Sequence, residues 1–83
     1  MEDAEVEATN RMPDFQLSKR ELEILQHLLH GRTSSQIAHS LSISKATVDT
    51  HRKNMLKKTN SKSTAELAVR SIKENWTAYF LKD

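Results

Sequence analysis

The chain has 83 residues, with 13 Lys and Arg against 11 Asp and Glu, and it contains no cysteine. This length allows one small domain. The missing thiols exclude disulfides, thiol catalysis and the commonest zinc sites, and the apolar runs are too short to span a bilayer. A single glycine and a single proline argue against a sheet protein with many turns.

Charge is distributed unevenly along the chain. Residues 1–15 carry five acidic residues against one arginine, whereas residues 16–83 carry 12 basic and six acidic residues. Six of the basic residues lie between positions 45 and 62, together with one acid, Asp49. Positive charge concentrated on one element is typical of a nucleic-acid-binding domain, although a solvated helix face would show the same pattern.

Residues 1–16 are predicted to form an acidic, disordered tail or linker, because they are weakly apolar and contain the only proline. The ordered domain is predicted to span residues 17–83. Within it, four helices are predicted in chain order, at residues 19–29, 34–41, 45–59 and 64–76 or beyond. No segment alternates clearly enough to be a strand, so the predicted fold class is all-α.

Local signals mark where these helices begin and end. Side chains that cap helix starts precede all four, three of them in a capping box: Ser18 with Glu21, Thr33 with Gln36, Ser63 with Glu66, and Ser44 alone. Gly31 and Asn60 follow the first and third segments, and both residue types tolerate a left-handed backbone.

The second and third helices are separated only by the sequence LSIS, residues 41–44. Two helices joined by a tight polar turn, the second of them basic, are typical of a helix-turn-helix. At 100° per residue, one arc of the third helix is predicted to pack inward and holds Val48, His51, Met55 and Thr59. The opposite arc is predicted to face outward and holds Ala46, Asp49, Thr50, Lys53 and Lys57.

The segment LSKRELEILQHLLHGRTSSQIAHSLSISKATVDTHRKNMLKK resembles the LuxR-type (NarL/FixJ, GerE-like) helix-turn-helix domain of bacterial transcription regulators. The resemblance covers about residues 17–76. The positions that match the family pattern in register are Leu17, Arg20, Glu21, Leu25, Gly31, Ile37, Ala38, Leu41, Ile43, Ser44, Thr47, Val48, His51 and Lys58. The chain departs from the pattern at Asp49, where many members have Lys, in KTNS at 58–61, and at Thr64.

The resemblance implies a four-helix, helix-turn-helix bundle of the LuxR type that binds double-stranded DNA as a transcription regulator. It implies that helix 45–59 enters the major groove and that helix 64–76 supplies the contact of a weak homodimer. The predicted dimer interface consists of Leu67, Val69 and Ile72, although these apolar residues would also suit the core. The acidic tail would suit a linker to a receiver or ligand-sensing domain, and a freestanding regulator is the alternative.

On the third helix, Asp49, Thr50 and Lys53 are the predicted base contacts. The predicted phosphate contacts are Lys45, Thr47, Arg52, Lys57 and Lys58, with Thr33, Ser34 and Ser35 at the start of the second helix. Asp49 has two interpretations. It accepts a hydrogen bond from cytosine and so sets specificity, or it pairs within the helix with Lys53 or Arg52.

Enzymatic and metal chemistry are not predicted. His27 and His30 are spaced i, i+3, but two imidazoles without a third ligand predict surface residues and not a metal site. His51 is predicted to be partly buried, hydrogen-bonded and structural. No catalytic residue and no cofactor are predicted.

Two further interpretations stay open, a helix-turn-helix used as a protein–protein interaction module and a fragment of a sigma factor. RNA polymerase is kept as a candidate second partner. The predicted location is the cytoplasm, in association with the nucleoid and not with a membrane.

Overall fold

The computed structural model describes residues 14–81, and this range contains helices and no strand. The helices are α2 (Lys19–Leu29), α3 (Ser34–Leu41), α4 (Lys45–Thr59), α5 (Thr64–Lys73) and α6 (Trp76–Leu81). The all-α class and the bounds predicted for the first three helices are confirmed. Most of the predicted tail, residues 1–13, and the last two residues lie outside the described range.

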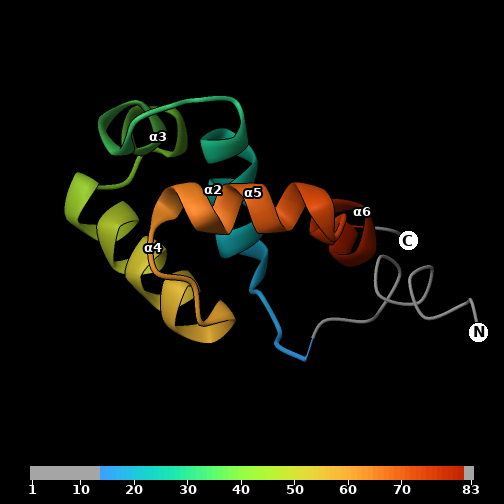
Figure 1. The fold of residues 1–83 in the computed structure, drawn as a ribbon. Helices are drawn as coiled ribbons and strands as arrows, with labels where there is room; N and C mark the ends of the chain where they lie inside the picture. Colours follow the sequence, from blue (N-terminus) through green and yellow to red (C-terminus); the bar gives the residue numbers. More distant parts are fainter. Residues whose placement is uncertain (1–13, 82–83) are drawn as a thin grey trace, which may run out of the picture.

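The helices pack around α2, which contacts α4, α5 and α6. Figure 1 shows α3 and α4 together at one end of the domain, with α5 crossing α2 and α6 at the opposite end. The turn between α3 and α4 is therefore held away from the two termini of the described chain.

Side-chain caps explain where the helices begin. Ser18 and Thr33 each form a complete capping box, with Glu21 and Gln36 respectively. The Ser44 hydroxyl accepts a hydrogen bond from the Thr47 backbone N–H, as predicted for α4. At the start of α5 the predicted box is only half formed. Ser63 accepts from the Glu66 backbone, but the Glu66 carboxylate accepts from the backbone of Lys62 instead of Ser63.

The tight turn between α3 and α4 depends on Ser42, which adopts a left-handed backbone with φ 58°. This conformation costs a non-glycine residue about 1–2 kcal/mol. It allows the Ile43 backbone N–H to donate to the Ala38 carbonyl at 3.0 Å, and it places the Ile43 side chain against the core. Asn60 ends α4 in the same conformation, as predicted.

The predicted fourth helix, 64–76, is interrupted. α5 ends at Lys73, Asn75 is left-handed with φ 58°, and α6 begins at Trp76. The break lets the Trp76 indole turn inward, where it is fully buried. Burying a side chain of this size stabilises the fold by about 4–6 kcal/mol, which exceeds the cost of one left-handed Asn.

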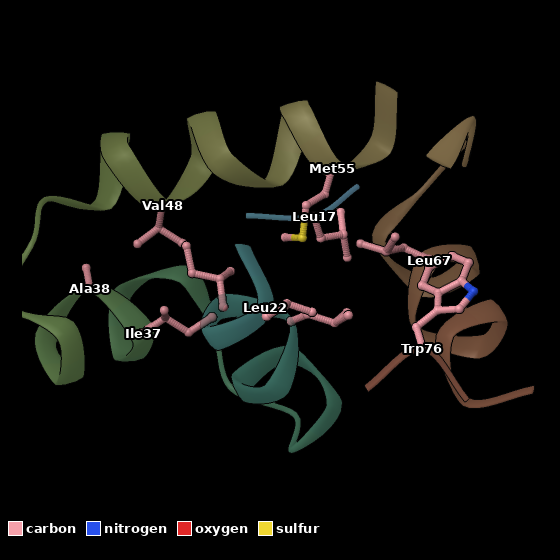
Figure 2. Close-up of a cluster of buried hydrophobic side chains, with 10 residues drawn as sticks. Leu17, Leu22, Ile37, Ala38, Val48, Met55, Leu67 and Trp76 are labelled. Atoms are coloured by element: carbon pink, nitrogen blue, oxygen red, sulfur yellow. The ribbon is translucent and has the colours of Figure 1, made fainter. Parts of the chain in front are cut away.

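The core is made by one apolar face from each of the packed helices (Figure 2). Val48 and Met55 project from α4 toward α3 and α2, and neither is exposed to solvent. The remaining buried apolar side chains are Leu17, Leu22, Ile24, Leu25, Ile37, Ala38, Leu67 and Trp76.

Phe15 extends the packed domain beyond the predicted boundary at residue 17. Its ring meets the Trp76 indole edge to face, with 4.8 Å between the ring centroids, and its centroid lies 6.0 Å from that of Phe80. The Arg70 guanidinium lies 5.3 Å from the centroid of the same indole. The segment before α2 is therefore joined to the C-terminal helices through Trp76.

Candidate nucleic-acid interface

The predicted inward and outward arcs of α4 are present in the structure. Val48, Met55 and Thr59 are buried, and His51 is half-buried. The His51 ring forms no hydrogen bond to the described residues, so the hydrogen-bonded role predicted for it is not seen there. The residues exposed on the opposite side, which we call the outer surface of α4, are Ala46, Thr50, Lys53, Asn54 and Lys57.

The outer surface of α4 presents charge and hydrogen-bonding groups that are not used by the fold. Lys53 and Lys57 make no ion pair or hydrogen bond with the described part of the chain, so their ammonium groups are available to a polyanion. Thr50 donates its hydroxyl proton to the Ala46 carbonyl at 3.0 Å, which leaves its oxygen free to accept. Asn54, which was not predicted as a contact from the sequence, has an amide suited to bidentate contact with adenine.

Asp49 lies at the edge of this surface, with a side chain that is 40% exposed. One carboxylate oxygen accepts from the Ser34 hydroxyl at 2.8 Å, and the other accepts from the Lys45 ammonium at 3.0 Å. The hydrogen bond from Ser34, followed by that from Lys45, lowers the pKa of Asp49 below its ordinary value. The carboxylate is thus held in its charged form and linked to α3.

Asp49 forms ion pairs within α4, as one interpretation of the sequence predicted, but only one of the two predicted partners is found. Arg52 lies at 3.7 Å from the Asp49 carboxylate, as one alternative proposed. The stronger ionic partner is Lys45, one turn toward the N-terminus, and not Lys53. This pairing leaves the Lys53 side chain unrestrained on the outer surface.

Arg52 joins three helices through its guanidinium group. It lies on α4, donates to the Ser34 hydroxyl on α3, and donates to the Thr64 hydroxyl on α5 at 2.7 Å. Its side chain is 30% exposed, so part of its charge still reaches solvent. Thr64, which was noted in the sequence only as a departure from the family pattern, is therefore a hydrogen-bond acceptor for this residue.

A shallow hollow lies at the start of α3. Three basic side chains line it, Arg32, Lys45 and Arg52, together with Thr33 and Ser34. The first turn of a helix carries backbone N–H groups that favour anions. The hollow therefore combines helix-terminal donors with three cations. Arg32 was not among the predicted contacts, although it directly precedes the capping Thr33.

The predicted phosphate contacts differ in how available they are. Ser35 and Lys45 are exposed, and Thr33 and Thr47 are exposed but engaged in capping interactions at the starts of α3 and α4. Ser34 is only 5% exposed, and its hydroxyl is occupied by Asp49 and Arg52. A direct phosphate contact by the Ser34 side chain therefore does not fit this structure.

Lys58, also predicted to contact phosphate, instead forms an ion pair within the domain. Its ammonium lies 2.8 Å from the Glu21 carboxylate, whose side chain is only 4% exposed. Burial acts to raise the pKa of Glu21, but hydrogen bonds from Lys58 and from the Ser18 backbone outweigh it and hold the pKa below its usual value. The pair fastens the end of α4 to the start of α2.

The three residues predicted for a dimer interface separate into two groups. Val69 is 55% exposed and Ile72 is 66% exposed, whereas Leu67 is 1% exposed and belongs to the core. Leu67 was wrongly placed on this surface, because a buried side chain has almost no area to offer a partner.

Neither a metal site nor a membrane-spanning helix is found in residues 14–81. No group of three or more His, Asp or Glu side chains there is arranged to hold a metal ion. The His27 ring instead contacts the Arg32 guanidinium at 3.1 Å, and the exposed His30 ring contacts the Gln26 carbonyl at 2.8 Å. No helix in this range combines the length and the apolar character needed to cross a membrane.

Comparison with known proteins gives a consistent result. Residues 15–71 match the family described as "Bacterial regulatory proteins, luxR family". The regulatory protein SdiA of Escherichia coli is 48% identical over 56 residues, which make up 68% of this chain and 23% of SdiA. The uncharacterized response regulatory protein YgeK of the same organism is 39% identical over 71 residues, or 86% of this chain and 48% of YgeK.

A solved structure supports the same fold. The structure of SdiA in complex with octanoyl-rac-glycerol superposes with a TM-score of 0.74 and 41% identity, covering 80% of this chain and 27% of SdiA. The chain thus spans between about a quarter and a half of the length of these relatives.

Proposed function

Because the chain belongs to the LuxR family of bacterial regulatory proteins, whose DNA-binding domain it represents, we propose that it reads duplex DNA by inserting α4 into the major groove. Membership of this family of regulatory proteins also confirms the prediction that this domain is not an enzyme. The proposal concerns which side chains meet the DNA and how the domain assembles on it.

The observation that carries the proposal is the outer surface of α4. Lys53 and Lys57 are exposed there without an ion-pair partner among the described residues, beside the free acceptor of Thr50 and the amide of Asn54. A helix fits the major groove, and Lys and Asn side chains suit guanine and adenine edges respectively. Of the predicted base contacts we therefore retain Thr50 and Lys53, and we add Asn54.

Backbone phosphates are proposed to meet the two ends of this surface. Lys57 lies toward the C-terminal end of α4, and the hollow at the start of α3 offers Lys45, Arg52 and Arg32. Ser35 and Thr47 are the remaining hydroxyl candidates, with Thr33 contributing through the helix start that it caps. Lys58 is a weaker candidate than Lys57 because Glu21 already holds it.

A weak homodimer is proposed through the exposed side of α5. Val69 and Ile72 are the two large apolar side chains most exposed to solvent in the described domain, and they lie on a helix that contacts α4. Two apolar side chains make a small contact, so pairing is expected to be weak alone and reinforced by DNA. RNA polymerase remains a candidate further partner, and the bacterial nucleoid in the cytoplasm is the proposed location.

The proposal is tested by fluorescence anisotropy with a labelled duplex selected from a randomised pool, titrated at several salt concentrations. Wild type is compared with Lys53→Ala and with Lys73→Ala, which removes an exposed lysine of α5 distant from the outer surface of α4. Lys53→Ala should weaken binding to the selected duplex, and Lys73→Ala should not. A wild type that retains no duplex at low salt overturns the proposal and favours a protein-interaction module.

A further inference from the structure

The Asp49 carboxylate is the centre of a cluster that spans two helices and reaches a third. It accepts from Ser34 on α3 and from Lys45 on α4, and it lies 3.7 Å from Arg52. Arg52 in turn donates to Ser34 and to Thr64 at the start of α5. A single carboxylate therefore orients two of the cations that line the hollow at the start of α3.

We propose that Asp49 is a positioning residue, which governs DNA recognition through Lys45, Arg52 and the α3–α4 contact and not by touching a base. This inference rests on the proposed function of the α4 surface. It changes the role predicted for Asp49 from the sequence, where a contact with cytosine was one interpretation.

The arrangement of partners supports this role. A carboxylate that met a base would point away from the domain, but Asp49 directs one oxygen back to Ser34, which is 5% exposed. Ser34 accepts from Arg52 while it donates to Asp49, so its hydroxyl is the link between the carboxylate and the guanidinium. Such a network of hydrogen bonds and ion pairs restricts long side chains that would otherwise sample many rotamers.

Two consequences for DNA binding follow from the charge of Asp49. The carboxylate repels phosphates and competes with them for Lys45 and Arg52, so it lowers affinity for any duplex. It also fixes where those cations stand, and phosphate contacts set the register in which the helix meets the bases. Removing the carboxylate should therefore raise non-specific affinity and loosen base preference at several positions together.

A direct base contact predicts a different pattern. Losing one hydrogen-bond acceptor in the groove relaxes the preference at one base pair in each half-site and leaves the others unchanged. The clearest discriminator is Ser34, because a buried hydroxyl cannot reach a base. If Asp49 acts through its partners, removing the Ser34 hydroxyl should reproduce the effect of removing the carboxylate.

The experiment measures base preference on a randomised duplex pool for wild type, Asp49→Asn, Ser34→Ala and Ser34→Thr, together with affinity for random-sequence duplex. Should Ser34→Ala fold poorly, Lys45→Gln changes the same cluster at a side chain that is 61% exposed. The thermal unfolding of each variant is measured first, so that binding is compared at a temperature at which every variant is folded. Thr50→Val is the control for loss of a single groove-facing acceptor.

We expect Asp49→Asn to raise affinity for random duplex roughly five- to tenfold per half-site at 0.1 M salt, as for one additional effective charge contact. Asp49→Asn and Ser34→Ala should weaken the same several base preferences, Lys45→Gln should change them in the same direction, and Ser34→Thr should restore the wild-type pattern. The inference is overturned if Asp49→Asn alters one base pair per half-site while Ser34→Ala and Lys45→Gln match wild type, or if Asp49→Asn alters none. Failure of wild type itself to bind duplex would overturn the proposed function as well, whereas binding with either of these patterns overturns only the role given to Asp49.

Discussion

The Lys58 ammonium lies 2.8 Å from the Glu21 carboxylate, and this ion pair joins the last turn of α4 to the first turn of α2. The same carboxylate accepts from the Ser18 backbone at 2.8 Å and so completes the cap of α2. One side chain thus combines a helix cap with a tertiary contact, and the adjacent residue Lys57 is left exposed. Two neighbouring lysines therefore differ in their contacts, since Lys58 is held in an ion pair and Lys57 has no such partner among the described residues.

Replacing Lys58 with Met should affect stability more than DNA binding. The change keeps the apolar stem but leaves the Glu21 carboxylate, 4% exposed, without its charged partner. Because Lys58 is itself 41% exposed, we expect a loss of about 1–2 kcal/mol in the free energy of unfolding, less than for a fully buried pair. Urea denaturation measures the loss. If the variant has the unfolding free energy of wild type but clearly lower duplex affinity, Lys58 contacts a phosphate and is not mainly structural.

Replacing Lys57 with Met should give the reverse pattern. Its ammonium has no ion-pair partner in the described structure, so stability should stay within about 0.5 kcal/mol of wild type. If Lys57 contacts one phosphate, the slope of log affinity against log salt should flatten by about 0.9 per half-site, equally for all sequences. Anisotropy titrations over a range of salt give the slope, with Lys73→Met as the control. An unchanged slope excludes a phosphate contact by Lys57.

Stability should fall in acid because of Glu21. Its pKa in the folded domain lies below the ordinary value of 4.5, so the unfolded chain binds the proton more readily. The carboxylate therefore contributes stability above about pH 4.5, and this contribution is lost as the pH falls through the folded pKa. The midpoint of thermal unfolding should decline over that window and decline less in Glu21→Gln. Glu23→Gln, an exposed partner of Arg20, should follow wild type, and parallel curves for all three would contradict this assignment.

Charged substitutions at an exposed and at a buried position of α5 should have different effects, the first on dimerisation and the second on folding. Val69→Glu puts a carboxylate on a side chain that is 55% exposed, so the domain should fold normally and lose dimerisation on DNA. Leu67→Glu puts a carboxylate into the core, where the wild-type side chain is 1% exposed, and the domain should unfold. Analytical ultracentrifugation with and without duplex, together with circular dichroism, distinguishes the two effects. A folded Val69→Glu variant that dimerises like wild type would exclude this side of α5 as the interface.

Local features of the fold could be predicted from the sequence. Ser18, Thr33 and Ser44 cap the helices that they were predicted to cap, because capping requires only residues three positions apart. The inward arc of α4 was also predicted, since Val48, Met55 and Thr59 fall on one side of a helix at 100° per residue. Helix periodicity therefore predicts most of the outward-facing residues of α4, but it missed the exposed Asn54 and the hydrogen bond that ties Asp49 to α3.

Features that depend on tertiary packing could not be predicted from the sequence. Trp76 shares a helical arc with Val69 and Ile72 only if the helix is continuous, and the left-handed Asn75 removes that continuity. Leu67 and Val69 lie on different sides of a helix whose apolar residues are widely spread, so the sequence does not say which side packs inward. The Asp49–Ser34 hydrogen bond joins residues 15 positions apart, and no local pattern indicates it.

Contact between the outer surface of α4 and DNA is tested most directly by titrating the isotopically labelled domain with a selected duplex and following each backbone amide by NMR. We predict that the largest shift changes occur at Thr50, Lys53, Asn54 and Lys57 and in the first turn of α3. Smaller changes are expected around Val69 and Ile72 as copies pair on the duplex. Shift changes confined to α5, with the α4 amides unaffected by saturating duplex, would contradict a groove-binding role for α4.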